Sequence, residues 1–335
     1  MKKKIKVSFF QRKPRENFDY SIEMFYKELF IYNSNVEIII KKLPFVSKGF
    51  FTRVCSTIWC FFNQNEINHV SGDINFVNFL LKKEKTILTI LDLYSLNRLK
   101  GLKRRIYKLF WLDLPLKRCS KIITISQKIK NEIISNFKVE SKKIEVISCS
   151  ISSTFKRKNK KLNFKELNIL FIGTGENKNL ERSIKALKKL KIKLIIIGEI
   201  KLKYLDLLKK NKINYLNYVN QTQKQIFRHY INSDILLFPS EYEGFGIPIL
   251  EAQAVGRLVV TSNNLKDISG KGAIYINPLS ITDIRRKIIN IQKKRYKVKK
   301  IIKIGFKNLD RYKLKDIKKK YLKVYNSFYE NIGSN

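Results

Sequence analysis

Short runs of large apolar and β-branched residues recur along the chain and alternate with segments whose apolar residues repeat every three to four positions. The short runs predict strands, and the periodic segments predict helices. In the first half, the predicted strands are Ile5–Phe10, Val36–Lys41, Glu66–Val70, Thr86–Asp92, Lys121–Ser126 and Ile144–Ser148, and the predicted helices are Tyr20–Tyr32, Phe50–Asn63, Ile74–Leu81, Leu99–Leu112 and Gln127–Asn136. Because helices separate the strands, we expect parallel pairing through crossover connections.

The alternation begins again after a polar, lysine-rich break at residues 156–161. The predicted strands are then Leu167–Gly173, Lys193–Gly198, Ile213–Val219, Ile235–Ser240, Leu258–Ser262 and Ala273–Asn277, and the predicted helices are Asn179–Leu190, Gln221–Asn232, Pro248–Val255 and Ile281–Gln292. Residues 293–329 are lysine-rich and helical in pattern. We predict an α/β protein with two doubly wound domains facing a cleft, at residues 1–155 and 162–310. A C-terminal helix at 311–335 is expected to pack back on the first domain.

The chain is strongly basic, with 70 Lys and Arg against 27 Asp and Glu and a net charge of +43. This charge favours anionic partners such as nucleic acid, lipid headgroups or phosphorylated substrates. The composition is also rich in Lys, Ile and Asn throughout, as AT-biased codons produce, so both a functional and a compositional origin stay open. The apolar run Phe50–Phe62 is too short to span a membrane and contains Arg53. With no secretory signal evident, we expect a cytoplasmic protein that lies on any membrane it meets.

The four cysteines fit no zinc or redox spacing. Cys55, Cys60 and Cys149 stand in or near apolar stretches, which predicts buried thiols in a reducing cytosol.

The most distinctive segment follows the predicted strand that ends at Ser240. Residues 241–251 read Glu-Tyr-Glu-Gly-Phe-Gly-Ile-Pro-Ile-Leu-Glu, so Glu243 and Glu251 bracket a glycine loop and the first turn of a helix. The backbone N–H groups of Gly246 and Ile247 would point out of the helix N-terminus and attract an anion. The alternative is an ordinary strand–loop–helix junction with two surface glutamates.

This segment resembles the Glu-x7-Glu signature of retaining glycosyltransferases of the family 4, or group 1, type, whose GT-B fold has two Rossmann-like domains. Every fixed position of the typical Glu-Gly-Phe-Gly-hydrophobic-Pro-x-x-Glu form is met. The resemblance implies an enzyme of hexosyltransferase type. Such an enzyme moves a sugar from a nucleotide-sugar to a glycan or lipid-linked acceptor, usually in bacterial surface polysaccharide biosynthesis (lipopolysaccharide, O-antigen or capsule).

A second loop, residues 173–179, reads Gly-Thr-Gly-Glu-Asn-Lys-Asn and opens a helix. Lys178 stands where its charge and the helix N-terminus both attract phosphate. In the family this loop usually binds the nucleotide diphosphate through an Arg and a Lys. Lys178 and Asn179 match the family pattern, and Thr174 stands where Arg is common. The alternative for Lys178 is a solvated lysine in a lysine-rich chain.

The resemblance also implies residue roles in the donor half. Glu251 is expected to hold the ribose hydroxyls, because a carboxylate accepts two hydrogen bonds, and Glu243 is expected to contact the donor sugar near its anomeric carbon. The predicted catalytic residues are Glu243, Lys178 and His69, and the predicted donor-binding residues are Gly173, Thr174, Asn179, Phe245, Gly246, Ile247 and Glu251. Glu241 is interpreted as a surface carboxylate.

In the acceptor half, Arg12, Lys13 and Arg15 follow the first strand, in a loop that resembles one of some family members. A solvated basic loop is the alternative. His69 lies in a stretch resembling the cleft edge of related enzymes, and its alternative is a packed core histidine. Asp92 is a further acceptor-side candidate.

Three other positions carry smaller predictions. Where the family often has His at the end of the next strand, this chain has Leu91. His229 is predicted to be structural, and Ser126 is predicted to cap the helix that follows it.

Two other functions compete with the transferase. A basic nucleic-acid-binding protein would explain the charge but leaves the Glu-x7-Glu loop unexplained. A non-catalytic, transferase-like partner subunit is kept open by Thr174 and Leu91. The expected partners are a nucleotide-sugar, a glycan or lipid-linked acceptor and the anionic inner face of the cytoplasmic membrane. No cofactor is expected, and no metal is needed if Lys178 and helix N-termini stabilise the leaving diphosphate.

Overall fold

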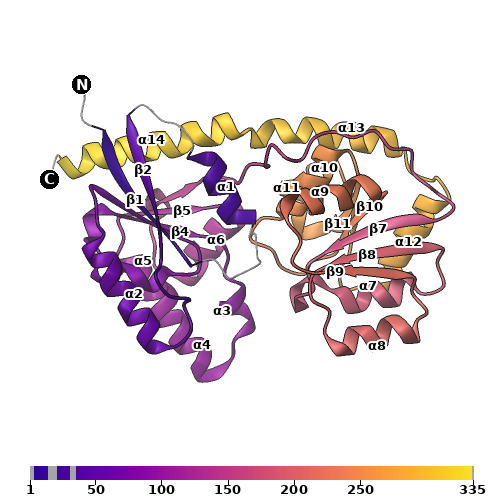
Figure 1. Ribbon diagram of the computed structural model, residues 1–335, viewed down its shortest axis with the longest axis horizontal. Coiled ribbons are helices and arrows are strands. Elements are labelled where there is room, and N and C mark those ends of the chain that lie inside the picture. The colour runs from indigo at the N-terminus through magenta and orange to yellow at the C-terminus, as the bar shows by residue number, and fades with distance from the viewer. Residues whose placement is uncertain (1–3, 14–20, 31–34, 334–335) are drawn as a thin grey trace. The chain divides into compact units, whose positions relative to one another are not determined.

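The computed structural model describes residues 4–13, 21–30 and 35–333. Its strands form two parallel six-stranded sheets, ordered β2-β1-β3-β4-β5-β6 and β12-β11-β10-β7-β8-β9 (Figure 1). The described residues divide into two compact units: unit 1 holds those of 1–16, 22–150 and 314–335, and unit 2 holds Ser21 and those of 151–313. The predicted α/β class with two doubly wound halves is confirmed.

Unit 1 contains each strand predicted for the first half, with slightly shifted ends. The strands are β1 (Ile5–Gln11), β2 (Val36–Lys42), β3 (Ile67–Ser71), β4 (Thr86–Ile90), β5 (Lys121–Thr124) and β6 (Ile144–Val146). The α-helices are α1 (Ser21–Leu29), α2 (Phe50–Phe62), α3 (Tyr94–Arg98), α4 (Gly101–Tyr107), α5 (Leu114–Lys117), α6 (Gln127–Asn136) and α14 (Leu314–Gly333). Short 3-10 helices are η1 (Asn75–Leu80), η2 (Lys83–Lys85) and η4 (Ser141–Lys143), and η3 (Lys108–Asp113) is a π-helical segment. Tyr20 and residues 31–32 of the first predicted helix lie outside the described residues.

Unit 2 repeats the architecture. Its strands are β7 (Leu167–Ile172), β8 (Ile192–Ile197), β9 (Tyr215–Tyr218), β10 (Ile235–Phe238), β11 (Leu258–Ser262) and β12 (Ile274–Ile276). Its helices are α7 (Leu180–Leu187), α8 (Leu202–Lys210), α9 (Gln223–Asn232), α10 (Ile247–Val255), α11 (Lys266–Ser269), α12 (Ile281–Gln292) and α13 (Val298–Asn308), with turns η5 (Glu176–Lys178), η6 (Asn263–Leu265) and η7 (Leu309–Tyr312). The sequence patterns did not predict α8.

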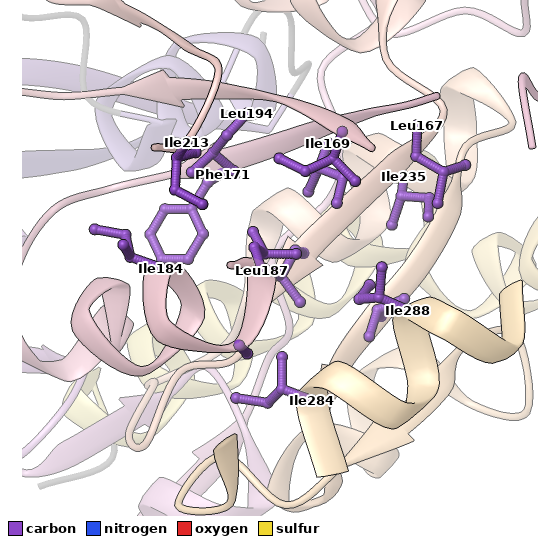
Figure 2. Close-up of a cluster of buried hydrophobic side chains, with 14 of the residues drawn as sticks. Leu167, Ile169, Phe171, Ile184, Leu187, Leu194, Ile213, Ile235, Ile284 and Ile288 are labelled. Atoms are coloured by element: carbon purple, nitrogen blue, oxygen red, sulfur yellow. The ribbon is translucent and has the colours of Figure 1, made fainter. Parts of the chain in front are cut away.

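Both faces of the unit 2 sheet are covered by helices. In Figure 1, α7 and α8 lie below β7–β9, and α9 and α10 lie above them. Ile169 and Phe171 of β7 join a core cluster with α7 and α12, whereas Leu170 joins a cluster with α9 and α10. Figure 2 shows Ile284 and Ile288 of α12 pointing into the first cluster. Burial on both faces explains why these strands are continuous apolar runs.

The lysine-rich break is fastened to unit 2. The Arg257 guanidinium donates through Nη2 to the carbonyl oxygen of Lys158 at 2.6 Å. Lys160 Nζ lies 3.1 Å from Oδ1 of Asp234, a fully buried carboxylate. These contacts make residues 158–160 part of unit 2 rather than a solvated linker.

His69 lies in the core of unit 1 and connects β3 to α14. Its Nδ1 is 2.7 Å from the Tyr325 hydroxyl, and its Nε2 is 2.7 Å from Thr89 Oγ1. The ring is fully buried and packs edge-on against Phe9. Burial lowers the pKa of His69 to about 3, so the imidazole is neutral near pH 7. Helix α14, yellow in Figure 1, is therefore tied to the sheet through a buried polar contact.

Helix α2 packs on unit 1 through small residues. Its buried residues are Ser56, Thr57 and Cys60. Cys60 and Cys149 are buried as predicted, but the prediction for Cys55 was wrong, because this residue lies on the exposed part of α2. No helix within the described residues is both long and apolar enough to cross a membrane.

Tyr325→Phe is expected to lower the free energy of unfolding of unit 1 by about 1–3 kcal/mol, because it leaves a buried ring nitrogen of His69 without its partner. The chain's two tryptophans, Trp59 and Trp111, lie in unit 1, so their fluorescence during urea unfolding reports on that unit. Tyr329→Phe, on the half-buried part of the same helix, is the control and should change stability by less than about 0.5 kcal/mol. Equal unfolding midpoints for both variants would contradict the proposed role of the His69 contact.

Candidate functional site

Two loops meet at the carboxyl ends of β7 and β10, which are neighbouring strands. Ile235 and Leu236 of β10 pair in parallel with Ile169 and Leu170 of β7, so the chain leaves both strands at the same edge. The loop after β7 leads into α7, and the loop after β10 leads into α10. Ligands of open α/β sheets bind at this edge.

Two asparagines hold the loops together. The backbone N–H of Glu241 donates to the carbonyl oxygen of Asn177 at 2.8 Å. Asn179 is buried in a left-handed backbone conformation, and its Nδ2 donates to the carbonyl oxygens of Pro239 and Pro278. The side chain of Asn179 thus fixes the positions of neighbouring loops.

Lys178 and Glu243 form an ion pair across the two loops. Lys178 Nζ lies 2.6 Å from Glu243 Oε1, and the two side chains are 21% and 13% exposed. The ammonium also lies 4.7 Å from the ring centroid of Phe238. A Cβ atom at Gly173 would come within 2.9 Å of Lys178 Cε, and Gly173 has φ +87°. Glycine is therefore needed at position 173 for Lys178 to reach Glu243.

The N-terminus of α10 is open to an anion. Gly246 is the residue before the helix, with φ 110°, and no side chain caps the helix. The first turn contains Pro248 and no acidic residue. Phe245 is buried against Tyr312, with ring centroids 5.7 Å apart, which anchors the loop just before the helix begins. Backbone N–H groups and the helix dipole give such a terminus a partial positive charge.

Glu251 is buried one turn inside α10. Its Oε2 lies 2.9 Å from the Tyr230 hydroxyl, which also lies 3.0 Å from the carbonyl oxygen of Pro248. Burial raises the pKa of Glu251 to about 7. The tyrosine has one proton for two acceptors. Both contacts become hydrogen bonds when Glu251 is protonated and donates to Tyr230, which then donates to Pro248.

The remaining predicted donor residues surround these groups. Thr174 Oγ1 donates to the carbonyl oxygen of Glu199, and Ile247 is the first residue of α10. Glu241 is exposed and paired with Arg182, which agrees with its interpretation as a surface carboxylate. The sequence reasoning missed Ser240, whose buried Oγ has no partner among the described residues. Its place two residues after β10, at the edge of the sheet where ligands bind, was the available signal.

The acceptor-side candidates lie in unit 1 and are not all grouped. Arg12 pairs with Asp73 at 2.8 Å, and Lys13 Nζ donates to the carbonyl oxygen of Pro44. Asp92 is exposed and accepts the Tyr94 N–H, whereas His69 is in the core. Arg15 lies outside the described residues.

Two smaller predictions are confirmed. Ser126 precedes α6, and its Oγ accepts the N–H of Ile129. His229 has its Nε2 2.9 Å from Gln221 Oε1, and its ring is tilted by 42° against the ring of Tyr218, as expected of a structural residue. Among the side chains that the structure describes, no three His, Cys, Asp or Glu residues are grouped to hold a metal ion.

Two doubly wound units, one of them with a glycine loop before an uncapped helix, define a protein of the GT-B type. Residues 152–308 match the family described as Glycosyl transferases group 1. The match lies within unit 2 and covers most of it, in agreement with the resemblance carried by the Glu-x7-Glu signature.

Known proteins are similar to this chain over different lengths. The O-antigen chain mannosyltransferase RfbU of Salmonella typhimurium is 31% identical over 188 residues, which cover 52% of each chain. The chain spans about half the length of the curated relatives it matches. Sucrose-phosphate synthase from Thermosynechococcus elongatus has a TM-score of 0.80 at 13% identity, covering 98% of this chain and 100% of that one. Anabaena HepE, solved with UDP and glucose, has a TM-score of 0.71 at 12% identity, covering 96% and 100%. At these identities the two structures establish the fold alone.

The buried carboxyl of Glu251 predicts a pH-dependent stability of unit 2. Between pH 4.5 and about 7, the unfolded chain loses this proton while the folded chain keeps it. Stability should therefore fall as the pH rises through this window, by up to about 1.4 kcal/mol per pH unit. Both tryptophans lie in unit 1, so unfolding of unit 2 should not change tryptophan fluorescence. Calorimetry at several pH values can therefore follow unit 2 as the unfolding transition without a fluorescence change.

Glu251→Gln should remove this pH dependence, because the amide does not ionise. Glu241→Gln, at an exposed carboxylate, should retain it. If the slope of stability against pH is the same in both variants, Glu251 is not the titrating group.

Proposed function

We propose that the protein is a retaining glycosyltransferase that moves a sugar from a nucleotide-sugar to a glycan or lipid-linked acceptor, in the assembly of bacterial surface polysaccharide such as lipopolysaccharide, O-antigen or capsule. The ion pair between Lys178 and Glu243, beside the open N-terminus of α10 in a group 1 domain, carries this proposal. The name of the Salmonella relative supports the polysaccharide setting, and the UDP complex of HepE supports the donor class. The proposed location is cytoplasmic and peripheral to the membrane.

The donor diphosphate is expected to bind between Lys178 and the N-terminus of α10. In the ligand-free chain, Glu243 compensates the half-buried charge of Lys178. Phosphate oxygens would take over that ion pair, because a dianionic group interacts more strongly with the ammonium. Glu243 is then free to contact the sugar, and Glu251 accepts hydrogen bonds from the ribose hydroxyls.

The reaction exchanges one bond at the anomeric carbon. The bond from that carbon to the phosphate oxygen breaks, and the acceptor hydroxyl oxygen bonds to the carbon on the same face. The hydroxyl proton passes to the departing phosphate oxygen. Lys178 and the α10 N-terminus stabilise the charge on the leaving diphosphate, so this scheme calls for no metal.

The acceptor roles are distributed differently from the sequence-based expectation. We propose that His69 positions α14 and takes no part in transfer, because both ring nitrogens are engaged in the core. Arg12, Lys13 and Asp92 remain the proposed acceptor-side residues, since each is at least partly exposed.

The first test is a thermal-shift panel of UDP-, GDP-, ADP- and CMP-sugars with RNA as a competitor. One nucleotide family should stabilise the protein. Lys178→Met should weaken binding of the matching nucleoside diphosphate by roughly tenfold or more, because a charge-assisted hydrogen bond is lost. Lys185→Met is the matched control, because Lys185 makes an exposed ion pair with Glu181 on α7. Stabilisation by RNA alone would favour a nucleic-acid-binding protein.

The two glutamates should separate binding from transfer. Glu243→Gln should bind the nucleoside diphosphate at least as tightly as the parent, because Lys178 no longer has a competing carboxylate, yet transfer should fall roughly a hundredfold or more. Glu251→Ala should lose transfer with the fold intact, as judged by circular dichroism. Near-normal transfer by either variant would refute the assigned site.

A further inference from the structure

Helix α2 presents its large apolar side chains to the outside. Phe51, Phe62 and Phe50 are 81%, 77% and 73% exposed, and Val54, Ile58 and Phe61 are also exposed. The buried face carries Ser56, Thr57 and Cys60 instead. A surface helix of a globular protein normally has the opposite arrangement, with its apolar stripe facing the core.

A second exposed apolar stripe runs along α4 and η3. Its members, Leu102, Ile106, Leu109 and Phe110, recur at helical spacing and are 70%, 48%, 43% and 43% exposed. The Arg53 guanidinium of α2 lies 4.6 Å from the ring centroid of Trp111 in η3, so α2 and η3 are in contact. In Figure 1, both α2 and α4 lie in the lower part of unit 1. We call these ten exposed side chains of α2, α4 and η3 the apolar surface.

The segments that carry the apolar surface are basic and contain few acidic residues. The sequence has no Asp or Glu between Glu37 and Glu66, or between Asp92 and Asp113. The second of these stretches carries six basic residues: Arg98, Lys100, Lys103, Arg104, Arg105 and Lys108. Exposed aromatic and aliphatic side chains with a basic rim match the boundary between acyl chains and anionic headgroups in a bilayer.

Other occupants fit less well. A second copy of the chain would bring the same positive charge against this face and be repelled. RNA would use the basic and aromatic residues, but not aliphatic Val54, Ile58, Leu102 and Ile106, which have no ring to stack on a base. A lipid bilayer would contact all ten side chains of the apolar surface as well as the basic residues beside them.

We propose that the apolar surface is a membrane-docking face that inserts its Phe, Leu and Ile side chains at the headgroup level of an anionic bilayer. The helices lie in the plane of the interface, because α2 has 13 residues and cannot span the acyl region. Lys100, Lys103 and Arg105 contact lipid phosphates at the rim. This inference specifies the peripheral location proposed above but rests on exposure and charge rather than on the transfer chemistry.

The test is co-sedimentation of the full chain with vesicles of phosphatidylglycerol and phosphatidylethanolamine, compared with phosphatidylcholine alone. Binding should require the anionic lipid. Phe51→Ser combined with Phe62→Ser should lower the partition coefficient roughly tenfold or more, because two inserted rings are lost. Leu202→Ser is the matched control, since Leu202 is 79% exposed on α8 in unit 2 and should leave binding unchanged.

A second pair of variants tests the rim. Changing Lys100, Lys103 and Arg105 to Gln should reduce binding by roughly a hundredfold, whereas changing Lys297, Lys299 and Lys300 of unit 2 to Gln removes the same charge and should have little effect. Equal losses from both triple variants would mean that total charge drives binding, and would overturn the docking face.

Three further outcomes would also overturn the proposal: no vesicle binding by the parent chain, unchanged binding after loss of Phe51 and Phe62, or a dimer that these two changes convert to monomer without any lipid binding. The donor thermal shift of the same variants should equal that of the parent. A failure of the docking face is thereby distinguished from a failure of the proposed transfer function.

Discussion

The pairing of β7 with β10 is the constraint on which the candidate site depends. It is secured at its start by Asp234, whose backbone N–H donates to the carbonyl oxygen of Asn168 and whose Oδ2 accepts the Asn168 N–H, both at 2.8 Å. Lys160 compensates the buried charge. A slip of one residue in this register would turn the core-facing side chains of one strand to the other face of the sheet and shift the loop that follows that strand. The contacts between Asp234 and Asn168 lie at the start of the two strands, opposite the candidate site, and they determine where each strand ends and its loop begins.

Burial shifts the pKa of two titratable residues, one in each unit. His69 and Glu251 are both shifted toward the neutral form, because burial penalises either ion. The two residues differ in how their polar atoms are paired. His69 is satisfied on both ring nitrogens, which suits a permanent structural contact. Glu251, one turn inside α10, contacts a single hydroxyl, that of Tyr230. Its pKa of about 7 means that it is about half ionised near neutral pH. His69 is fully buried, whereas Glu251 keeps 5% of its surface exposed.

The sequence predicted the strands and the signature well, because both depend on local pattern. The apolar run Ile235–Phe238 is a strand buried on both faces, and Gly246 of the signature has φ 110°, a backbone conformation that other residues avoid. The partner of His69 was not predictable, because Tyr325 is 256 residues away. The orientation of α2 was also missed. Periodicity shows that a helix has an apolar face but does not show whether that face meets the core or the outside, and the error for Cys55 has the same origin.

The last helix belongs to the first unit. Unit 1 is interrupted by the whole of unit 2 and is completed by α14, which supplies Tyr321 and Tyr325 to its core. During synthesis, unit 2 is entirely available to fold before the strands of unit 1 receive the helix that covers His69. The strands of unit 1, although synthesised before unit 2, are thus the later of the two sets to reach their final packing.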